Sequence, residues 1–181
     1  MEGYLKYYDL EKYLFEDVHQ KFHQHGFIAA FDFFCILEWK ASRAKTYHVP
    51  RLEKIDNDLD IACEILTKSI YEIKGRKEKM RFLIEKHTFK LPTASAILSV
   101  LYPEDFTVYD IRVCNELKNF YSLDNLIFEN RWNKYEEYIN KVKEITDKSL
   151  SLRDKDRYLW GKSFKEQLEG NIRTNFSKEI K

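Results

Sequence analysis

An aspartate and a helical hairpin are the features of this chain that could do chemistry. Asp110 stands where a helix running to about Phe120 would begin, so its carboxylate can cap that helix. A carboxylate held in place can also stabilise developing positive charge or take a proton from water. Residues 82–101, just before it, predict two helices joined by a tight break. Asp110 therefore has two interpretations, a plain helix cap and a catalytic group.

Charge is polarised along the chain, although the formal net charge is only +1. Between residues 76 and 90, six Lys and Arg stand against Glu78 and Glu85, whereas residues 1–20 carry five acids and two Lys. Solvated helix faces commonly produce such runs. A phosphate-binding surface would also need a basic face, so this polarity permits nucleic-acid binding without establishing it.

Two segments around Asp110 follow a known pattern. The first reads Leu91-Pro92-Thr93-Ala94-Ser95-Ala96-Ile97-Leu98, and the second reads Phe106-Thr107-Val108-Tyr109-Asp110-Ile111-Arg112-Val113. They resemble the helix-hairpin-helix DNA glycosylase superfamily, which includes endonuclease III and adenine DNA glycosylase. That family has L-P-G-x-G-x-x-T-A-x-x-(V/I)-L in its hairpin and, at a spacing that this chain matches, (V/I)-D-x-x-V with the catalytic aspartate. The resemblance implies a DNA glycosylase with Asp110 as its catalytic carboxylate.

Two further segments extend the resemblance over about residues 27–160. Leu37-Glu38-Trp39-Lys40-Ala41-Ser42 looks like the family's L-S-x-Q-x-T segment, whose Gln fills the gap left by an extruded base. Residues 153–160 resemble an R-x-x-D-x-x-L-W segment of small bacterial glycosylase-like proteins. The site residues that we expect are Trp39, Lys40, Tyr109 and Trp160 for the base pocket or wedge, and Arg43, Lys86, Lys90, Thr93 and Arg112 for DNA contacts. Packing roles for the aromatic residues and helix-end charges for Lys40 and Arg43 are the alternatives.

Departures from the family pattern refine the expected reaction. The hairpin glycines are replaced in the region 88–91, where Lys90 offers a direct ion pair to phosphate instead. Pro92 stands where bifunctional members carry a Schiff-base Lys, so we expect hydrolysis that leaves an intact abasic site. Three dispersed cysteines cannot build an iron–sulfur cluster, and we expect no cofactor. His19 and His23, one helical turn apart, lack a defined third ligand, so we expect no metal either.

Helical periodicity predicts the elements that must position these residues. We expect an all-α fold, a helix-hairpin-helix glycosylase-like bundle of roughly eight to ten helices. It would form a single domain over residues 1–181, with the hairpin near 82–101 and a disordered tail at 171–181. The segment 27–45, apolar nearly all round, would lie at its centre, and the last helix would turn Leu159, Trp160, Phe164 and Leu168 inward. The other helices are predicted over residues 4–23, 59–73, 77–87, 93–101, 110–120 and 132–142, and the last one over 153–168.

Composition excludes several other classes of protein. Only 5 Gly and 3 Pro among 181 residues disfavour turn-rich sandwiches and disordered linkers. The longest apolar run falls far short of the roughly 18 residues that a membrane span needs. The first residues lack a signal-peptide pattern, and Cys35, Cys63 and Cys114 form no disulfide framework. We expect a cytoplasmic monomer that binds DNA and no membrane.

Two alternatives to the enzyme stay open. One is a non-catalytic helix-hairpin-helix module that binds nucleic acid, and the other is a helical interaction protein in which all these features are structural. The missing hairpin glycines favour the alternatives, whereas the spacing to Asp110 and the match at Lys40-Ala41-Ser42 favour the glycosylase. Neither the excised base nor a repair or phage-defence role follows from the residues.

Overall fold

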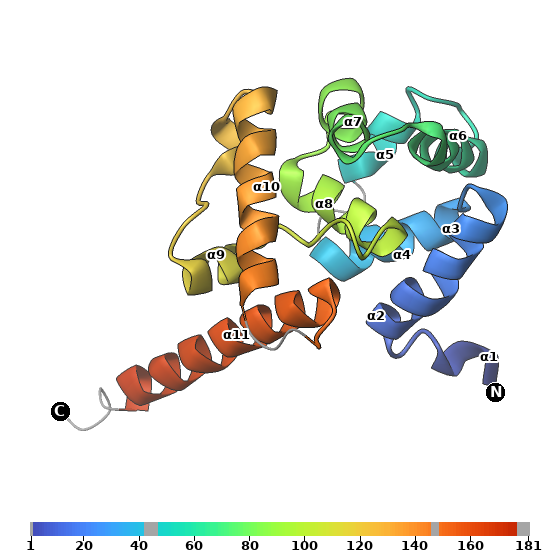
Figure 1. The fold of residues 1–181 in the computed structure, drawn as a ribbon. Coiled ribbons are helices and arrows are strands. Elements are labelled where there is room, and N and C mark those ends of the chain that lie inside the picture. Colours follow the sequence, from blue (N-terminus) through green and yellow to red (C-terminus); the bar gives the residue numbers. More distant parts are fainter. Residues whose placement is uncertain (1, 42–46, 146–148, 177–181) are drawn as a thin grey trace. The chain divides into compact units, whose positions relative to one another are not determined.

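The computed structural model describes residues 2–41, 47–145 and 149–176. Over these ranges every regular element is a helix, which confirms the predicted all-α class (Figure 1). The chain divides into two compact units, unit 1 at residues 1–107 and unit 2 at residues 108–181. The single glycosylase-like domain over 1–181 stays a prediction.

Unit 1 begins with short helices and ends with the hairpin. Its elements are α1 (Glu2–Leu5), α2 (Leu10–Tyr13), the π-helical turn η1 (Leu14–Val18), α3 (His19–His25), α4 (Ala30–Ala41), α5 (Val49–Leu52), α6 (Leu59–Glu72), α7 (Arg76–Arg81), the π-helical turn η3 (Phe82–Lys86) and α8 (Leu91–Leu101). The predicted pair of helices with a tight break between residues 82 and 101 is therefore present.

Helix α8 is the most deeply buried element of unit 1. All its residues from Ala94 to Leu101 are buried, and α3, α4, α7 and the turn η1 pack against it. Its two serines make buried hydrogen bonds inside the helix: the hydroxyl of Ser99 donates to the Ser95 carbonyl at 2.6 Å, and that of Ser95 to the Pro92 carbonyl at 3.1 Å. Helix α8, the second helix of the hairpin, thus provides hydrogen-bond acceptors for its own serine hydroxyls.

Helix α4 departs from the prediction of a helix that is buried nearly all round. Phe31 is 58% exposed, whereas the neighbouring Asp32 is only 6% exposed. The Asp32 carboxylate accepts hydrogen bonds from the Tyr13 hydroxyl at 2.5 Å and the Lys21 ammonium at 2.8 Å. A buried carboxylate is tolerated when it is paired in this way, so the partners on α2 and α3 decide which face of α4 turns inward.

A glycine and a side-chain cap define two helix ends in unit 1. Gly26 ends α3 with φ 79°, in the left-handed region, where the missing side chain avoids strain. Asp58 caps α6, because its carboxylate accepts the amides of Asp60 and Ile61 at 2.9 and 3.1 Å. The N-terminal helix that we predicted over residues 4–23 is instead interrupted between α1 and α2, where Asp9 starts a new helix by accepting the amide of Lys12.

Unit 2 consists of a few helices after an extended entry at residues 108–110. They are α9 (Ile111–Leu117), the 3₁₀ turn η4 (Leu123–Asn125), α10 (Phe128–Glu144) and α11 (Leu152–Phe176). The inner face of α10 is aromatic and aliphatic at helical spacing, as predicted for its C-terminal part. It is formed by Phe128, Trp132, Tyr135, Tyr138, Ile139 and Val142.

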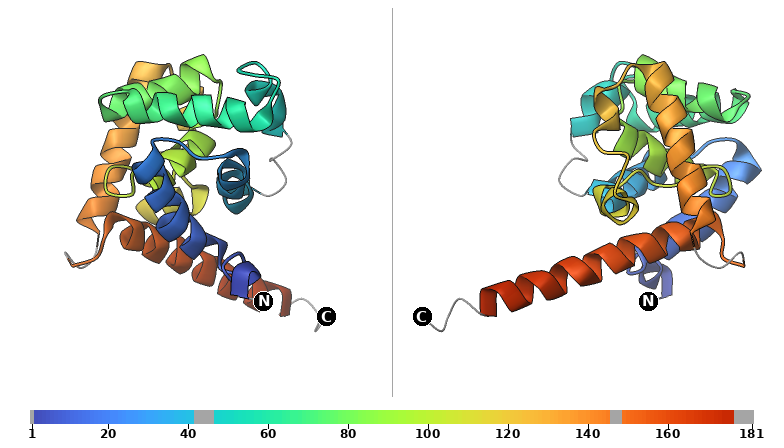
Figure 2. Two further views of the ribbon diagram at one scale, coloured as in Figure 1. Left: turned by 90° about the vertical axis from the view of Figure 1, so that its right-hand side faces the viewer. Right: turned by 60° about the vertical axis from the view of Figure 1, so that its left-hand side comes forward.

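Helix α11 corrects two predictions. Leu159 is buried as expected, but Trp160, Phe164 and Leu168 are 42–46% exposed rather than turned inward. The helix also continues through residues 171–176, the first part of the tail that we predicted to be disordered, and the rest of that tail lies outside the described residues. Figure 2 shows α11 as one continuous helix. Its sequence has no proline to stop it. Within the described residues, no helix combines the length and apolar character that crossing a membrane requires.

Candidate functional site

The hairpin turn, residues 87–90 in unit 1, has an unusual backbone. Thr88 adopts φ 56°, a left-handed conformation that costs a residue with a side chain about 1–2 kcal/mol. The Phe89 amide donates to the Leu83 carbonyl at 3.0 Å, and the Phe89 ring is buried. When Thr93-Ala94 is aligned with the T-A pair of the glycosylase pattern, Thr88 falls on its first hairpin glycine. The turn therefore takes a backbone conformation that favours glycine, although the glycine is missing.

Only part of the basic run at residues 76–90 is exposed around this turn. Lys86 and Lys90 are exposed on either side of it, and Thr93 is half-buried in the first turn of α8. Lys79 instead is buried and donates to the Ile70 carbonyl near the C-terminal end of α6, and this burial lowers the pKa of Lys79 to about 8. Fewer side chains are thus available to bind phosphate than the six Lys and Arg of this run indicate.

A basic recess beside the hairpin turn was not anticipated from the sequence. Arg51 of α5 donates from Nε to the Thr88 hydroxyl at 3.2 Å and from Nη1 to the Tyr47 carbonyl at 2.8 Å. Its guanidinium also lies 4.5 Å from the centre of the Tyr47 ring. The recess is open, with a volume of about 510 Å³, and is lined by Tyr47, Pro50, Arg51, Lys54 and Thr88. The only signal in the sequence is Arg51 and Lys54 on one helical turn after Pro50.

The residues predicted to act as a wedge lie at the end of α4. Trp39 is half-buried and meets Phe15 edge-to-face, with ring centres 5.6 Å apart. Lys40 is half-buried in the last turn of the helix, where its charge also suits the helix dipole. Arg43 lies outside the described residues. The Trp39 contact is of the packing kind, and the DNA roles of these side chains stay predictions.

Asp110 caps helix α9 of unit 2, as its position in the sequence predicts. Its backbone is extended, with φ −138° and ψ 140°, and its carboxylate accepts the amide of Arg112 at 3.0 Å. The side chain is half-buried. A cap of this kind holds the carboxylate in one orientation, which serves a structural role and a catalytic role equally well.

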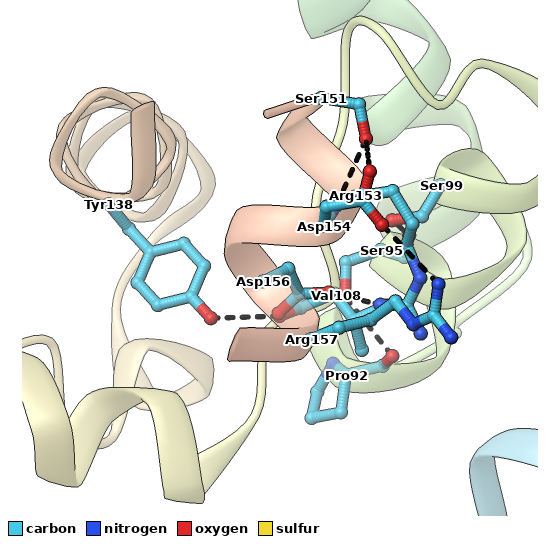
Figure 3. Close-up of polar contacts among 10 residues, drawn as sticks. All are labelled: Pro92, Ser95, Ser99, Val108, Tyr138, Ser151, Arg153, Asp154, Asp156 and Arg157. Carbon is cyan, nitrogen blue, oxygen red and sulfur yellow. Dashed lines mark hydrogen bonds and ion pairs between the residues drawn. The ribbon is translucent and has the colours of Figure 1, made fainter. Parts of the chain in front are cut away.

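Tyr138, buried on α10, holds the segment that leads into Asp110. Its hydroxyl donates to the Val108 carbonyl at 2.8 Å (Figure 3). It also makes a hydrogen bond with the backbone of Asp110. Burial raises the pKa of Tyr138 well above its usual value, so the hydroxyl keeps its proton. Sequence reasoning missed Tyr138, although it lies three residues after Tyr135 on the apolar face of α10.

Tyr109 points into unit 2. Its hydroxyl donates to the Phe120 carbonyl at 2.6 Å and accepts the Leu123 amide at 3.3 Å. Its ring packs edge-to-face on Tyr138, with centres 5.6 Å apart. These contacts favour the packing interpretation of Tyr109 over stacking on an extruded base.

Arg112 and Trp160 meet on the surface of unit 2. The Arg112 guanidinium lies 5.0 Å from the centre of the Trp160 ring and 5.3 Å from that of Phe164, and it donates to the Gln167 side chain at 2.8 Å. The rings of Trp160 and Phe164 are stacked, with centres 5.5 Å apart. The structure therefore brings two predicted site residues together, at an exposed aromatic row rather than in a pocket.

An ion pair and a serine cap stabilise the start of α11. Arg153 and Asp156 form an ion pair in which the Asp156 carboxylate is almost fully buried, and they are the R and D of the R-x-x-D-x-x-L-W segment (Figure 3). The Ser151 hydroxyl accepts the Asp154 amide at 3.1 Å and donates to the Asp154 carboxylate at 2.7 Å, which caps the helix. This segment therefore has a structural explanation inside unit 2.

The paired histidines of α3 cap the end of α8. A ring nitrogen of His19 lies 3.1 Å from the Val100 carbonyl, and one of His23 lies 2.9 Å from the Leu101 carbonyl. Hydrogen bonds to these carbonyls satisfy acceptors that a helix end leaves without partners. Within the part of the chain that the structure describes, no three His, Cys, Asp or Glu side chains gather in a way that could hold a metal ion.

The predicted residues are thus divided between the two units. Unit 1 holds the hairpin turn with Lys86, Lys90 and Thr93, and unit 2 holds Asp110 and Arg112. In comparisons with family models, curated proteins and solved structures, none was found to match this chain.

Proposed function

We propose that this protein is a monofunctional DNA glycosylase that hydrolyses the N-glycosidic bond of a damaged or modified base. The observation that carries the proposal is the left-handed turn at Thr88, on the position of a hairpin glycine in the glycosylase pattern. The rest of the pattern supports it, because Asp110 caps the helix that carries the D-x-x-V segment. An all-helical fold hosts many activities, so the site residues and not the fold support this function.

The reaction breaks the bond between C1′ of the deoxyribose and the base nitrogen, and water supplies the new C1′–O bond. Positive charge develops on the sugar as the base leaves with the bonding electrons. The Asp110 carboxylate would stabilise this charge and accept a proton from the attacking water. The base must first leave the helical stack, which a side chain such as Lys40 would support by filling the gap.

Basic side chains near the hairpin turn would hold the DNA backbone. Lys86 and Lys90 are exposed beside the turn. Phosphate contacts of this kind position a duplex without reading its sequence. In unit 2, Arg112 is the second residue of α9. Its guanidinium packs against the ring of Trp160.

The sharpest test replaces Asp110 by Asn, which caps a helix about as well. Duplex DNAs that each carry one oxidised, alkylated or deaminated base are incubated with the protein, and abasic sites are revealed by alkali. For the base that the wild type releases, Asp110→Asn should lower the rate by about 10²- to 10³-fold. DNA binding should be unchanged or tighter, because a negative charge is removed.

Asp58→Asn is the matched control, since Asp58 also caps a helix through its carboxylate. It should retain the wild-type rate. Base release at the wild-type rate by a folded Asp110→Asn variant would contradict the catalytic assignment.

Reaction type is tested separately by borohydride trapping. Pro92 has no amine, so water is the expected nucleophile and no covalent adduct with substrate DNA should form. An adduct would overturn the monofunctional assignment, and its loss in Lys40→Ala or Lys90→Ala would name the amine.

The basic recess favours one second candidate, a nucleic-acid-binding module without catalysis. The recess brings two cations, Arg51 and Lys54, and the exposed ring of Tyr47 beside the hairpin turn. Such a surface binds a nucleic-acid strand by charge and stacking alone. Salt-dependent DNA binding with no base release from any substrate of the panel would establish this candidate in place of the enzyme.

A further inference from the structure

The basic recess of unit 1 is lined by hydrogen-bond donors and positive charge. Tyr47, Arg51 and Lys54 follow one another at helical spacing through α5 and the turns that flank it, so they share one face. Thr88 of the hairpin turn completes the lining together with Pro50. No carboxylate of the described residues contributes to it. A lining of this composition is complementary to an anion.

Arg51 is held in place by the protein, yet most of its donors are unused. Its Nε atom donates to the Thr88 hydroxyl at 3.2 Å and to the Thr88 carbonyl at 3.3 Å, and its Nη1 atom donates to the Tyr47 carbonyl at 2.8 Å. These contacts use two of the five N–H groups of a guanidinium, so three find no acceptor among the described residues. Because the side chain is already ordered, binding an anion costs it little conformational entropy.

Two more donors face the same recess. The Thr88 hydroxyl accepts the Nε–H group of Arg51, and its own proton has no acceptor among the described residues. Lys54 is exposed and forms no ion pair within the described part of the chain. A phosphate monoester carries three terminal oxygens and a charge of about −1.5 to −2 at neutral pH, which suits two cations and a hydroxyl. A phosphodiester has only one negative charge and two such oxygens.

An aromatic ring borders these donors. The Tyr47 ring is 63% exposed, and the Arg51 guanidinium covers one of its faces at 4.5 Å from the ring centre. The opposite face is therefore accessible. Nucleobases of every kind stack on an exposed aromatic face. The volume of about 510 Å³ also lies in the range of small-molecule sites.

We propose that the basic recess binds a nucleotide by its terminal phosphate, with the phosphate on Arg51, Lys54 and Thr88 and the base stacked on Tyr47. Two sources carry this phosphate monoester, a free nucleotide and the phosphorylated 5′ end of a DNA strand. The inference goes beyond the proposed function, because the site requires neither Asp110 nor base release. The left-handed backbone of Thr88 fits this role, since strained residues are common at ligand clamps.

Calorimetric titration of the full chain with deoxyadenosine 5′-monophosphate (dAMP) at low salt tests the proposal. The wild type should bind dAMP with a dissociation constant below about 1 mM, because the donors are preorganised. Deoxyadenosine, which lacks the phosphate, should bind at least tenfold more weakly. Excess inorganic phosphate should displace dAMP, because it competes for the same donors.

Variants locate the binding in the recess. Arg51→Lys keeps the charge but loses the planar fork, and it should weaken dAMP binding about tenfold. Lys54→Gln should weaken it about threefold, as expected for an exposed ion pair, and Tyr47→Leu about tenfold through the lost stacking. Lys12→Gln is the matched control, since Lys12 is exposed on α2 and does not line the recess; it should bind dAMP like the wild type.

Two single-stranded oligonucleotides of one sequence, with a 5′-phosphate or a 5′-hydroxyl, distinguish the sources. If the phosphorylated strand binds at least tenfold more tightly than the other, and Arg51→Lys removes the difference, a DNA end is the source. Equal binding of the two strands by a protein that binds dAMP makes the free nucleotide the source.

Binding of dAMP no tighter than that of deoxyadenosine would overturn the proposal. So would equal affinities for dAMP in Lys12→Gln, Lys54→Gln and Tyr47→Leu, or two strands that bind equally to a protein that does not bind dAMP. Far-UV circular dichroism checks folding, and Lys54→Gln and Tyr47→Leu alter only exposed side chains, so the test stands even if Arg51→Lys unfolds. The titrations measure binding alone, so their outcome is independent of whether Asp110 is catalytic.

Discussion

His48 should make the stability of unit 1 fall steeply below neutral pH. Its side chain is only 6% exposed and stacks on the buried ring of Phe89, with centres 5.3 Å apart. Its Nδ1 atom is buried and has no hydrogen-bond partner among the described residues. Burial, aided by the nearby Arg51 charge, lowers the pKa of His48 to about 4 from 6.5.

The sign and size of the effect follow from this pKa. Between pH 6.5 and pH 4 the unfolded chain binds a proton at His48 that the folded chain does not, so stability is full above pH 6.5 and falls as the pH drops through this window. For the two pKa values above, the loss between pH 7.5 and pH 5 amounts to about 2 kcal/mol. Burial lowers the pKa of His87 in the same direction, so the wild type should lose more than this amount.

The variant His48→Phe isolates the contribution of His48. Phenylalanine keeps a flat ring against Phe89 but cannot take up a proton. Urea unfolding followed by circular dichroism at pH 7.5 and pH 5, at constant ionic strength, should give His48→Phe a pH-dependent loss about 2 kcal/mol smaller than that of the wild type. At pH 7.5 the two proteins should differ by less than about 1.5 kcal/mol, the usual cost of a volume-conserving change. Equal losses in both proteins would refute the reasoning.

Two further predictions concern the backbone around the candidate site. Thr88→Gly should be about 1 kcal/mol more stable than Thr88→Ala in urea unfolding, because both lose the hydroxyl that accepts from Arg51 but only glycine relieves the left-handed strain. Equal stabilities would mean that the turn is not strained. Tyr138→Phe should lower the free energy of unfolding by about 1–3 kcal/mol in the same assay, because the Val108 carbonyl loses its buried donor. The variant should also slow base release if Asp110 is catalytic. An unchanged stability would show that Tyr138 does not anchor this segment.

Local physics made much of the fold predictable from the sequence. The glycine at position 26 ends a helix because it enters the left-handed region without strain, and Asp58 and Asp110 start helices because their carboxylates accept amides that lie next to them in the chain. The all-α class followed from helical periodicity in the same way, since positions three and four apart share one face. The location of Asp110 at a helix start was therefore predictable, whereas its catalytic role stays a prediction.

Only tertiary structure decided which side chains are buried and which are exposed. Asp32 is buried and Phe31 exposed because Tyr13 and Lys21, on other helices, satisfy the carboxylate. Trp160, Phe164 and Leu168 are exposed, whereas Leu159 and Ser163 of the same helix are buried. Such outcomes depend on partners distant in the sequence, and periodicity identifies an apolar face without saying what will cover it.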